Sequence, residues 1–187
     1  MMAFTRDDIL YLLRRLSTLA KADGVTLEIA FYGGSCLLLA YGYEDRQLTK
    51  DIDAIIRPEG AAEALVRKIT REEDLPEDWL DSGVRQFLSP VGQTYVSKLP
   101  ELKSLPHLKI SFPTAEYLIA MKLRSSVRAR FGYEGDLTDL RFLARKTGLR
   151  SLADAQAILD RFFDDEVIPP RAVHVLEEVC DENSEKT

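Results

Sequence analysis

The sequence is poor in the residues that build the commonest metal and redox sites. Its 187 residues include only two cysteines and two histidines. These four side chains match none of the short ligand spacings of zinc sites, and two cysteines do not build a disulfide framework. We therefore expect neither zinc nor structural disulfides. Cys36 falls in an apolar segment, where a free thiol is typical of a small buried side chain.

Long apolar runs and common catalytic motifs are also missing. No stretch approaches the roughly 20 apolar residues that a membrane-spanning helix needs. Arg6, Asp7 and Asp8 interrupt the apolar start that a signal peptide requires, so we expect a cytoplasmic protein without a membrane segment. The sequence contains neither the P-loop motif of many nucleotide hydrolases nor the Gly-x-Ser-x-Gly elbow of serine hydrolases.

The composition is that of an ordinary folded chain. Hydrophobic residues make up 45% and charged residues 30%, which is typical of soluble globular proteins. The net charge of −6 argues against broad coating of nucleic acid but allows a local basic site. We expect an α+β fold with a small mixed sheet in residues 1–112. A helical part, residues 113–187, would pack on the same core, or the whole would be one domain.

Local patterns predict most of the helices and strands. Thr5 and Asp8 form a capping-box pattern ahead of an amphipathic helix that should end near Gly24. Alternation or apolar periodicity predicts strands at 27–31, 94–98 and 108–112 and a helix at 59–71. Further helices should begin at Thr114 and Ser151, end at Gly148, and span 172–179. We expect residues 181–187 to be frayed.

A glycine pair stands between an expected strand and an expected helix. Gly33 and Gly34 follow the run 27–31, and Ser35 opens an apolar segment that should be helical to about Glu44. Glycine lets the chain turn tightly and approach a ligand, and serine is a favoured N-cap residue. Because a helix N-terminus offers unpaired N–H groups, the pattern predicts a phosphate-binding turn. The alternative is a plain strand-to-helix turn.

Two carboxylates follow this turn. Asp51 and Asp53 lead into the apolar run 54–56, which is typical of a buried strand. Side chains two positions apart on a strand point the same way, so both carboxylates should face one side. Such a pair can hold Mg²⁺ ions that also bind triphosphate oxygens. The alternative is a solvated entry to the strand.

Together these residues resemble the signature of a known fold. Gly33, Gly34 and Ser35 followed by the run TKDID at 49–53 resemble the polymerase-β-like nucleotidyltransferases. The second motif is similar in particular to the AbiEii-type toxins and their relatives. The resemblance implies a nucleotidyltransferase fold in which the glycine turn and Lys50 bind the nucleotide. It also implies that Asp51 and Asp53 are catalytic metal ligands.

The second half of the resemblance lies further along the chain. In the AbiEii-type family a lysine of an L-x-A-x-K-L helix reaches the nucleotide, and Lys122 stands at that position. Its alternative is a lysine that extends to solvent. The family also has a D-x-x-D-L run opening a helix, which Asp136 and Asp139 match. Either could be a catalytic carboxylate, and the alternative is a helix cap formed by both.

One strand departs from the polymerase-β-like pattern. Those enzymes commonly carry a third carboxylate on a later strand of the sheet. In the expected strand 108–112, the polar positions are instead Lys109 and Ser111. The complete three-carboxylate site is therefore in doubt, unless Asp136 or Asp139 replaces the missing group.

The segment between Lys122 and Arg150 is locally basic. In an acidic chain such a segment is a candidate track for a triphosphate or an RNA backbone. The equal alternative is the ordinary solvated surface of helices. Its remaining basic residues are Arg124, Arg128, Arg130, Arg141, Arg145 and Lys146.

The leading hypothesis is a Mg²⁺-dependent nucleotidyltransferase that moves NMP from an NTP to a hydroxyl group. The resemblance implies an RNA 3′ end such as that of tRNA, or a protein, as acceptor. It also implies a toxin with a cognate antitoxin as partner. Two alternatives stay open. The first is a protein of this fold that binds a nucleotide or partner without turnover, and the second is a phosphoesterase that uses the same carboxylates.

Overall fold

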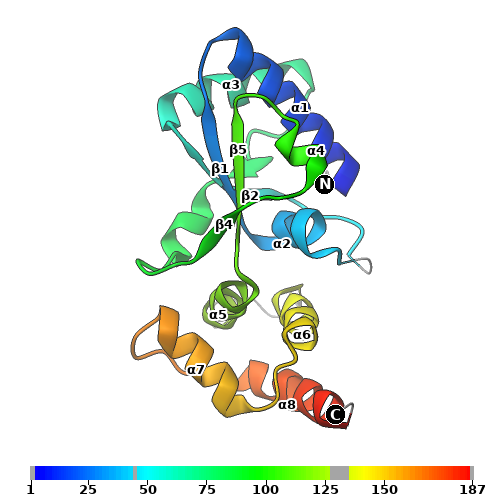
Figure 1. The fold of residues 1–187 in the computed structure, drawn as a ribbon, viewed down its shortest axis with the longest axis vertical. Coiled ribbons are helices and arrows are strands. Elements are labelled where there is room, and N and C mark those ends of the chain that lie inside the picture. Colours follow the sequence, from blue (N-terminus) through cyan, green and yellow to red (C-terminus); the bar gives the residue numbers. More distant parts are fainter. Residues whose placement is uncertain (1–2, 44–45, 127–134, 186–187) are drawn as a thin grey trace. The chain divides into compact units, whose positions relative to one another are not determined.

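The computed structural model describes residues 3–43, 46–126 and 135–185. The chain divides into two compact units. The sheet unit comprises Met1–Gln86 and Thr94–Pro113, and the helical unit comprises Phe87–Gln93 and Thr114–Thr187. The chain therefore passes between the units three times (Figure 1). In the described ranges, no helix has both the length and the apolar character needed to cross a membrane.

Five strands form a mixed sheet in the order β3-β2-β1-β5-β4. The central strand β1 (Leu27–Phe31) runs antiparallel to β2 (Ile52–Arg57) and parallel to β5 (Leu108–Pro113). At the edges, β3 (Leu80–Asp81) pairs parallel with β2, and β4 (Thr94–Val96) pairs antiparallel with β5. The predicted α+β class with a mixed sheet is confirmed.

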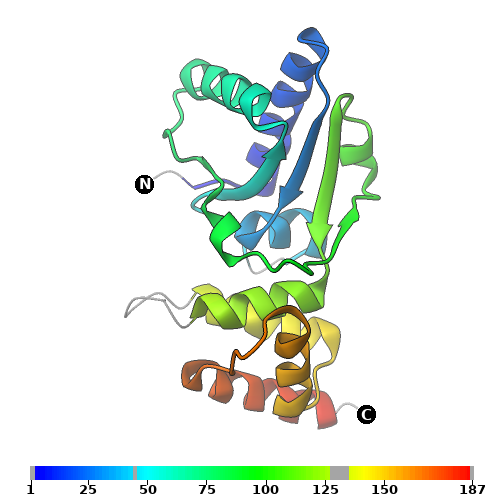
Figure 2. The same cartoon turned by 90° about the vertical axis from the view of Figure 1, so that its left-hand side faces the viewer.

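Helices cover one face of this sheet. Helix α1 (Arg6–Ala22) begins with the predicted capping box of Thr5 and Asp8, and α3 (Glu59–Glu72) follows β2. Figures 1 and 2 show the two helices side by side over the same face. The apolar side chains of α1 meet those of β1 and β2 around a small interior space. Burying each such side chain stabilises the fold by about 1.5–3 kcal/mol.

Strand alternation places polar side chains on the opposite face. Glu28 on β1 and Lys109 on β5 are register neighbours, and the Lys109 ammonium donates to the Glu28 carboxylate at 2.8 Å. Their side chains are 58% and 56% exposed, so this ion pair contributes little to stability. Asp53 and Arg57 of β2 continue the same polar face.

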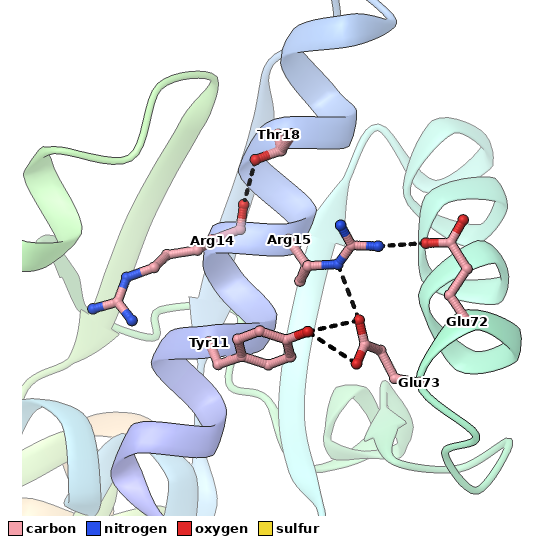
Figure 3. A network of polar contacts seen from close by, with 6 residues as sticks. All are labelled: Tyr11, Arg14, Arg15, Thr18, Glu72 and Glu73. Carbon is pink, nitrogen blue, oxygen red and sulfur yellow. Dashed lines mark hydrogen bonds and ion pairs between the residues drawn. The ribbon is translucent and has the colours of Figure 1, made fainter.

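A surface network ties α1 to the end of α3 (Figure 3). The Arg15 guanidinium contacts Glu72 at 2.5 Å and Glu73 at 3.0 Å, and the Tyr11 hydroxyl donates to Glu73 at 2.9 Å. The hydrogen bond to the Glu73 carboxylate raises the pKa of Tyr11. Because these groups are close to water, the network adds little to stability. Its main effect is to orient α1 relative to the end of α3.

Four long helices lie in the described part of the helical unit. They are α5 (Ala115–Ser126), α6 (Gly135–Thr147), α7 (Leu152–Phe162) and α8 (Pro170–Glu185). The predicted N-caps are confirmed, since Thr114 accepts from the N–H of Tyr117 and Ser151 from that of Asp154. The predicted stop at Gly148 is confirmed by its left-handed φ of +66°.

The predicted fraying from residue 181 is wrong, because α8 continues to Glu185. Contacts to α6 and its end hold this last turn. Glu182 accepts two hydrogen bonds of 2.7 Å from Arg145, and the Asn183 amide donates to the Leu149 carbonyl at 2.9 Å. Residues 186 and 187 lie outside the described ranges.

Short helices complete the fold. They are α2 (Gly33–Cys36), the π-helix η1 (Leu37–Tyr41), the 3-10 helix η2 (Gly83–Phe87) and α4 (Pro100–Lys103).

A buried tyrosine explains why residues 87–93 belong to the helical unit. The Tyr117 hydroxyl of α5 accepts a hydrogen bond of 2.8 Å from the N–H of Ser89. The ring also fills the space beside Gly92, where a Cβ would lie 2.5 Å from the hydroxyl oxygen. Burial raises the pKa of Tyr117, so the hydroxyl stays neutral at ordinary pH.

Replacing Tyr117 by phenylalanine should lower the free energy of unfolding by about 1–3 kcal/mol, because the buried Ser89 N–H loses its acceptor. Chemical denaturation measures this change. Tyr11→Phe is the control, since its hydroxyl bonds Glu73 at the surface and its loss should cost clearly less than the loss in Tyr117→Phe. Equal losses in the two variants would contradict the assigned role of Tyr117.

Candidate functional site

The glycine turn directly follows the segment of β1 that pairs with β2. Tyr32 N–H donates to the Asp53 carbonyl at 2.9 Å and so extends the ladder by one residue. Gly33 then takes a φ of +53°, which turns the chain from the strand into α2. This left-handed conformation costs other residues roughly 1–2 kcal/mol, so glycine is required on conformational grounds alone.

Asp53 lies against this turn. A Cβ on Gly33 would stand 2.0 Å from Oδ2 of Asp53, which means that the carboxylate occupies the space a side chain would need. The structure therefore brings together two of the predicted groups, the glycine turn and the second aspartate of the D-x-D motif. Their contact is local, because both belong to the sheet unit.

The second glycine is crowded by two residues that the sequence did not single out as site residues. A Cβ on Gly34 would lie 2.3 Å from Nη2 of Arg46 and 2.7 Å from Oγ1 of Thr49. Thr49 is buried and pairs with Phe4 through backbone hydrogen bonds of 2.7 and 2.9 Å. Its hydroxyl donates to the Asp51 carbonyl at 3.0 Å. These contacts hold the residue two positions before Asp51 next to Gly34 of the glycine turn.

Ser35 is not the N-cap of this helix. The helix begins two residues earlier, at Gly33, with Tyr32 in the cap position. Ser35 is fully buried, and its hydroxyl donates to the Tyr32 carbonyl at 2.9 Å. The cap prediction failed because the positive φ of Gly33 starts the helix at once. The helix also ends earlier than predicted, at Tyr41, and Glu44 lies outside the described residues.

Asp51 and Lys50 precede the sheet. β2 begins at Ile52, one residue after Asp51, and both Asp51 and Lys50 are exposed. The prediction that Asp51 and Asp53 face one way through strand alternation is therefore wrong in its reason, because only Asp53 lies on the strand. The loop that Thr49 fixes sets the position of Asp51 instead.

Another carboxylate lies next to Asp53. Asp81 on β3 is the register partner of Asp53, and no sequence pattern predicted it because β3 is only two residues long. Its carboxylate accepts a hydrogen bond of 2.8 Å from the N–H of Gly83. No group of three or more His, Cys, Asp or Glu side chains in the described ranges is arranged to hold a metal ion.

Gly33→Ala should lower the free energy of unfolding by more than about 2 kcal/mol, because it adds a clash with Asp53 to the left-handed strain. Gly24→Ala is a matched control. Gly24 has a similar φ of +65°, but a Cβ there would meet nothing within 4 Å. Chemical denaturation of both variants gives the part of the loss in unfolding free energy that comes from the clash. Equal losses in the two variants would show that a side chain at Gly33 does not clash with Asp53.

The other predicted catalytic residues form a separate cluster in the helical unit. The Lys122 ammonium contacts Oδ1 of Asp136 at 2.7 Å and Oδ2 of Asp139 at 2.8 Å. The three side chains are only 12%, 16% and 1% exposed. Lys122 does not extend to solvent, so that alternative is wrong. The cap alternative for Asp136 is also wrong, since α6 begins at Gly135 and Asp136 accepts from the Ser125 hydroxyl.

Charge holds this cluster together. Burial acts to lower the pKa of Lys122, but the negative charges of Asp139 and Asp136 outweigh burial and raise the pKa above its ordinary value. A raised pKa stabilises the folded state fully below the unfolded value of about 10.4, and the stabilisation disappears only at higher pH. The ammonium therefore stays charged at physiological pH and links α5 to α6.

Three described basic residues of the following segment have acidic neighbours. Arg124 contacts Glu166 at 3.4 Å, Arg145 contacts Glu182 at 2.7 Å, and Arg141 pairs with Glu178. Arg128 and Arg130 lie outside the described residues. The pairing favours the solvated-surface interpretation over a track for RNA or triphosphate, because these positive charges already have counter-charges.

No family model, curated protein or solved structure matches this chain. The function is therefore inferred from the geometry of the glycine turn and from the residues that surround it.

Proposed function

We propose that the protein is a Mg²⁺-dependent nucleotidyltransferase of the polymerase-β-like kind, with its phosphate site at Gly33–Ser35. The observation that carries the proposal is the contact between Asp53 and Gly33. It places a carboxylate directly beside the start of a helix, where N–H groups are unpaired and the field is positive. A magnesium-bound polyphosphate carries both charges and complements this pair of features.

The residues present fit magnesium. Mg²⁺ commonly binds one or two carboxylates, keeps several waters and takes its other ligands from substrate phosphates. Asp53 and the exposed Asp51 would be those carboxylates, so the site needs no cage of three acidic groups. The bound ion would neutralise charge on the phosphates during transfer.

In the proposed reaction, an acceptor hydroxyl oxygen forms a bond to the α-phosphorus of an NTP. The bond from this phosphorus to the bridging oxygen breaks, pyrophosphate leaves with the electron pair, and the hydroxyl proton passes to a base. The partly exposed backbone of Gly33 would bind phosphate oxygens, and Asp53 would position the ion. The exposed Lys50 would contact the nucleotide from the loop ahead of β2.

The acceptor, an RNA 3′ end such as that of tRNA or a protein hydroxyl, follows from the family resemblance alone. So does the context of a toxin with an antitoxin. A role of Lys122, Asp136 or Asp139 at the nucleotide also stays a prediction. Their described contacts give them a structural role within the helical unit.

A second candidate is a protein of this fold that binds a nucleotide without turnover. The polar positions of β5 favour it, because Lys109 and Ser111 stand where an additional carboxylate is expected. Asp81 does not replace that group directly, since its carboxylate is bound to the N–H of Gly83.

The test is incubation with each α-labelled NTP, Mg²⁺, and total RNA or cell protein. The wild type should transfer label and release pyrophosphate, and Asp51→Ala and Asp53→Ala should not. Asp78→Ala, at an exposed carboxylate of the same unit, is the control and should behave like the wild type. Transfer that survives both site substitutions would rule out the proposed site, and NTP binding without release would support the second candidate.

A further inference from the structure

The outer edge of β2 continues past the strand that covers it. Of the described strands, only β3 lies on that side of β2, and its register covers Ile52 and Asp53. β3 ends at Asp81, whereas β2 runs on to Arg57. In the described sheet, the second half of β2 therefore pairs on one side, with β1.

The register shows which backbone groups this open edge presents. The Tyr32 N–H donates to the Asp53 carbonyl, and hydrogen-bonded pairs alternate along an antiparallel ladder. Ile55 therefore bonds to β1 through its pairing with Ala30. Ile56 falls between hydrogen-bonded pairs, so its N–H and C=O point away from β1, toward the open edge. A backbone N–H and C=O in this position need a partner, either water or a ligand.

A pocket of about 160 Å³ lies at this edge, within the sheet unit. Its apolar lining comes from β2, α3 and β3: Ala54, Ile56, Ala62, Val66 and Leu80. Cavities of about 150 Å³ in proteins take a group as large as benzene, so the pocket has room for one leucine side chain. The pocket is open to solvent, and Ser82 on its rim is exposed.

The rim of the pocket carries a surplus of negative charge. Glu59 and Glu63 of α3 lie there together with Arg85 of η2. The Arg85 guanidinium donates to the Glu59 carboxylate at 2.6 Å, so these two charges compensate each other. Glu63 is exposed, and none of the ion pairs between described residues uses it. A ligand with a cationic group beside its apolar group would complement this rim.

We propose that this edge of β2 and its pocket bind an extended peptide with a leucine two positions from a basic residue. The peptide would pair with Ile56 as an added strand, a common mode of peptide recognition. Side chains opposite each other in paired strands share a face, so the leucine opposite Ile56 would enter the pocket. Side chains two positions apart on a strand also share a face, which would bring the basic residue to Glu63.

This proposal is independent of the nucleotide site. The described lining of the pocket includes neither the glycine turn nor Asp53. Peptide binding and nucleotide transfer can therefore succeed or fail separately.

The probe is the peptide acetyl-Lys-Thr-Leu-Thr-Lys-amide, titrated into the isotope-labelled full chain and followed by NMR. On saturation the amide signal of Ile56 should move downfield, because a new hydrogen bond forms there. The amide signal of Ile55 should move much less, since it already bonds to β1. For the same reason, in the free protein the Ile56 amide should exchange with solvent faster than the Ile55 amide.

Three changes probe the parts of the proposed contact. Methylating the leucine nitrogen of the peptide removes the donor to the Ile56 carbonyl and should weaken binding about tenfold. Ser82→Trp, at the exposed rim, should block the pocket and weaken binding at least as much. Glu63→Lys should weaken binding about 3- to 10-fold. Glu77→Lys makes the same charge change at an exposed site outside the pocket lining and should bind like the wild type.

The opposite outcomes overturn the proposal or a stated part of it. If the peptide does not bind, or binds equally well when methylated, no strand is added at Ile56. This comparison uses the wild-type protein, so it does not depend on the folding of a variant. An Ile56 amide that exchanges as slowly as that of Ile55 in the free protein would mean that the edge is already paired. If the Ile56 signal shifts with protein concentration alone and sedimentation shows a dimer, a second copy occupies the edge instead. Equal weakening by Glu63→Lys and Glu77→Lys would remove the basic residue from the recognised sequence.

Discussion

Asp53→Asn should lower the rate of nucleotide transfer at least about 100-fold, the scale on which removing one charge-stabilising group slows such reactions. Asparagine keeps the size and the backbone pairing of Asp53 with Tyr32, so the glycine turn should remain folded. What it removes is the negative charge that would hold Mg²⁺. Initial rates of pyrophosphate release at saturating NTP measure the loss.

Asp81→Asn is the matched control for this substitution. Asp81 is the register neighbour of Asp53 in the sheet, but its carboxylate is bound to the Gly83 N–H. Its replacement should leave transfer within a few-fold of the wild type. If the two variants lose activity equally, the carboxylate at the glycine turn has no special part in the reaction.

Lys122→Met should lower the free energy of unfolding by about 3–5 kcal/mol, the cost of breaking a buried ion pair from one side. The substitution removes the ammonium that contacts both Asp136 and Asp139 and joins α5 to α6. Urea denaturation, monitored by circular dichroism, measures the change. Lys109→Met is the control, because its pair with Glu28 is more than half exposed and its loss should change the stability much less.

A second variant checks the cause of that loss. Replacing Lys122, Asp136 and Asp139 together by methionine, asparagine and leucine removes the buried charges as a group. The triple variant should be more stable than Lys122→Met alone, since no uncompensated carboxylate remains. If the single variant is as stable as the wild type, the cluster does not hold the two helices together.

Local signals in the sequence were sufficient for much of the fold. The capping box of Thr5, the caps at Thr114 and Ser151, and the glycine stop at 148 each depend on neighbouring residues. The alternation at 27–31 and 108–112 likewise follows from one buried face of the sheet. Such elements can be predicted because their causes lie within a few positions along the chain.

The site depends on contacts between segments that are distant in the sequence. Local sequence patterns do not predict such contacts. Arg46 and Thr49 lie beside Gly34. Backbone pairing with Phe4 fixes Thr49 there, and no local sequence pattern predicts this contact. Asp81 reaches Asp53 through a two-residue strand that is too short to show periodicity. Ser35 was misplaced for the opposite reason, since a single left-handed glycine moved the helix start by two residues.

The central claim is that Asp53 and the glycine turn together bind a magnesium-bound polyphosphate. Its most direct test is calorimetric titration of an NTP, with and without Mg²⁺, into the wild type and Asp53→Asn. We predict that Mg²⁺ strengthens binding to the wild type by at least about tenfold, or 1.4 kcal/mol, and has no such effect on Asp53→Asn. An affinity that is the same in both proteins and indifferent to Mg²⁺ would contradict the proposed site.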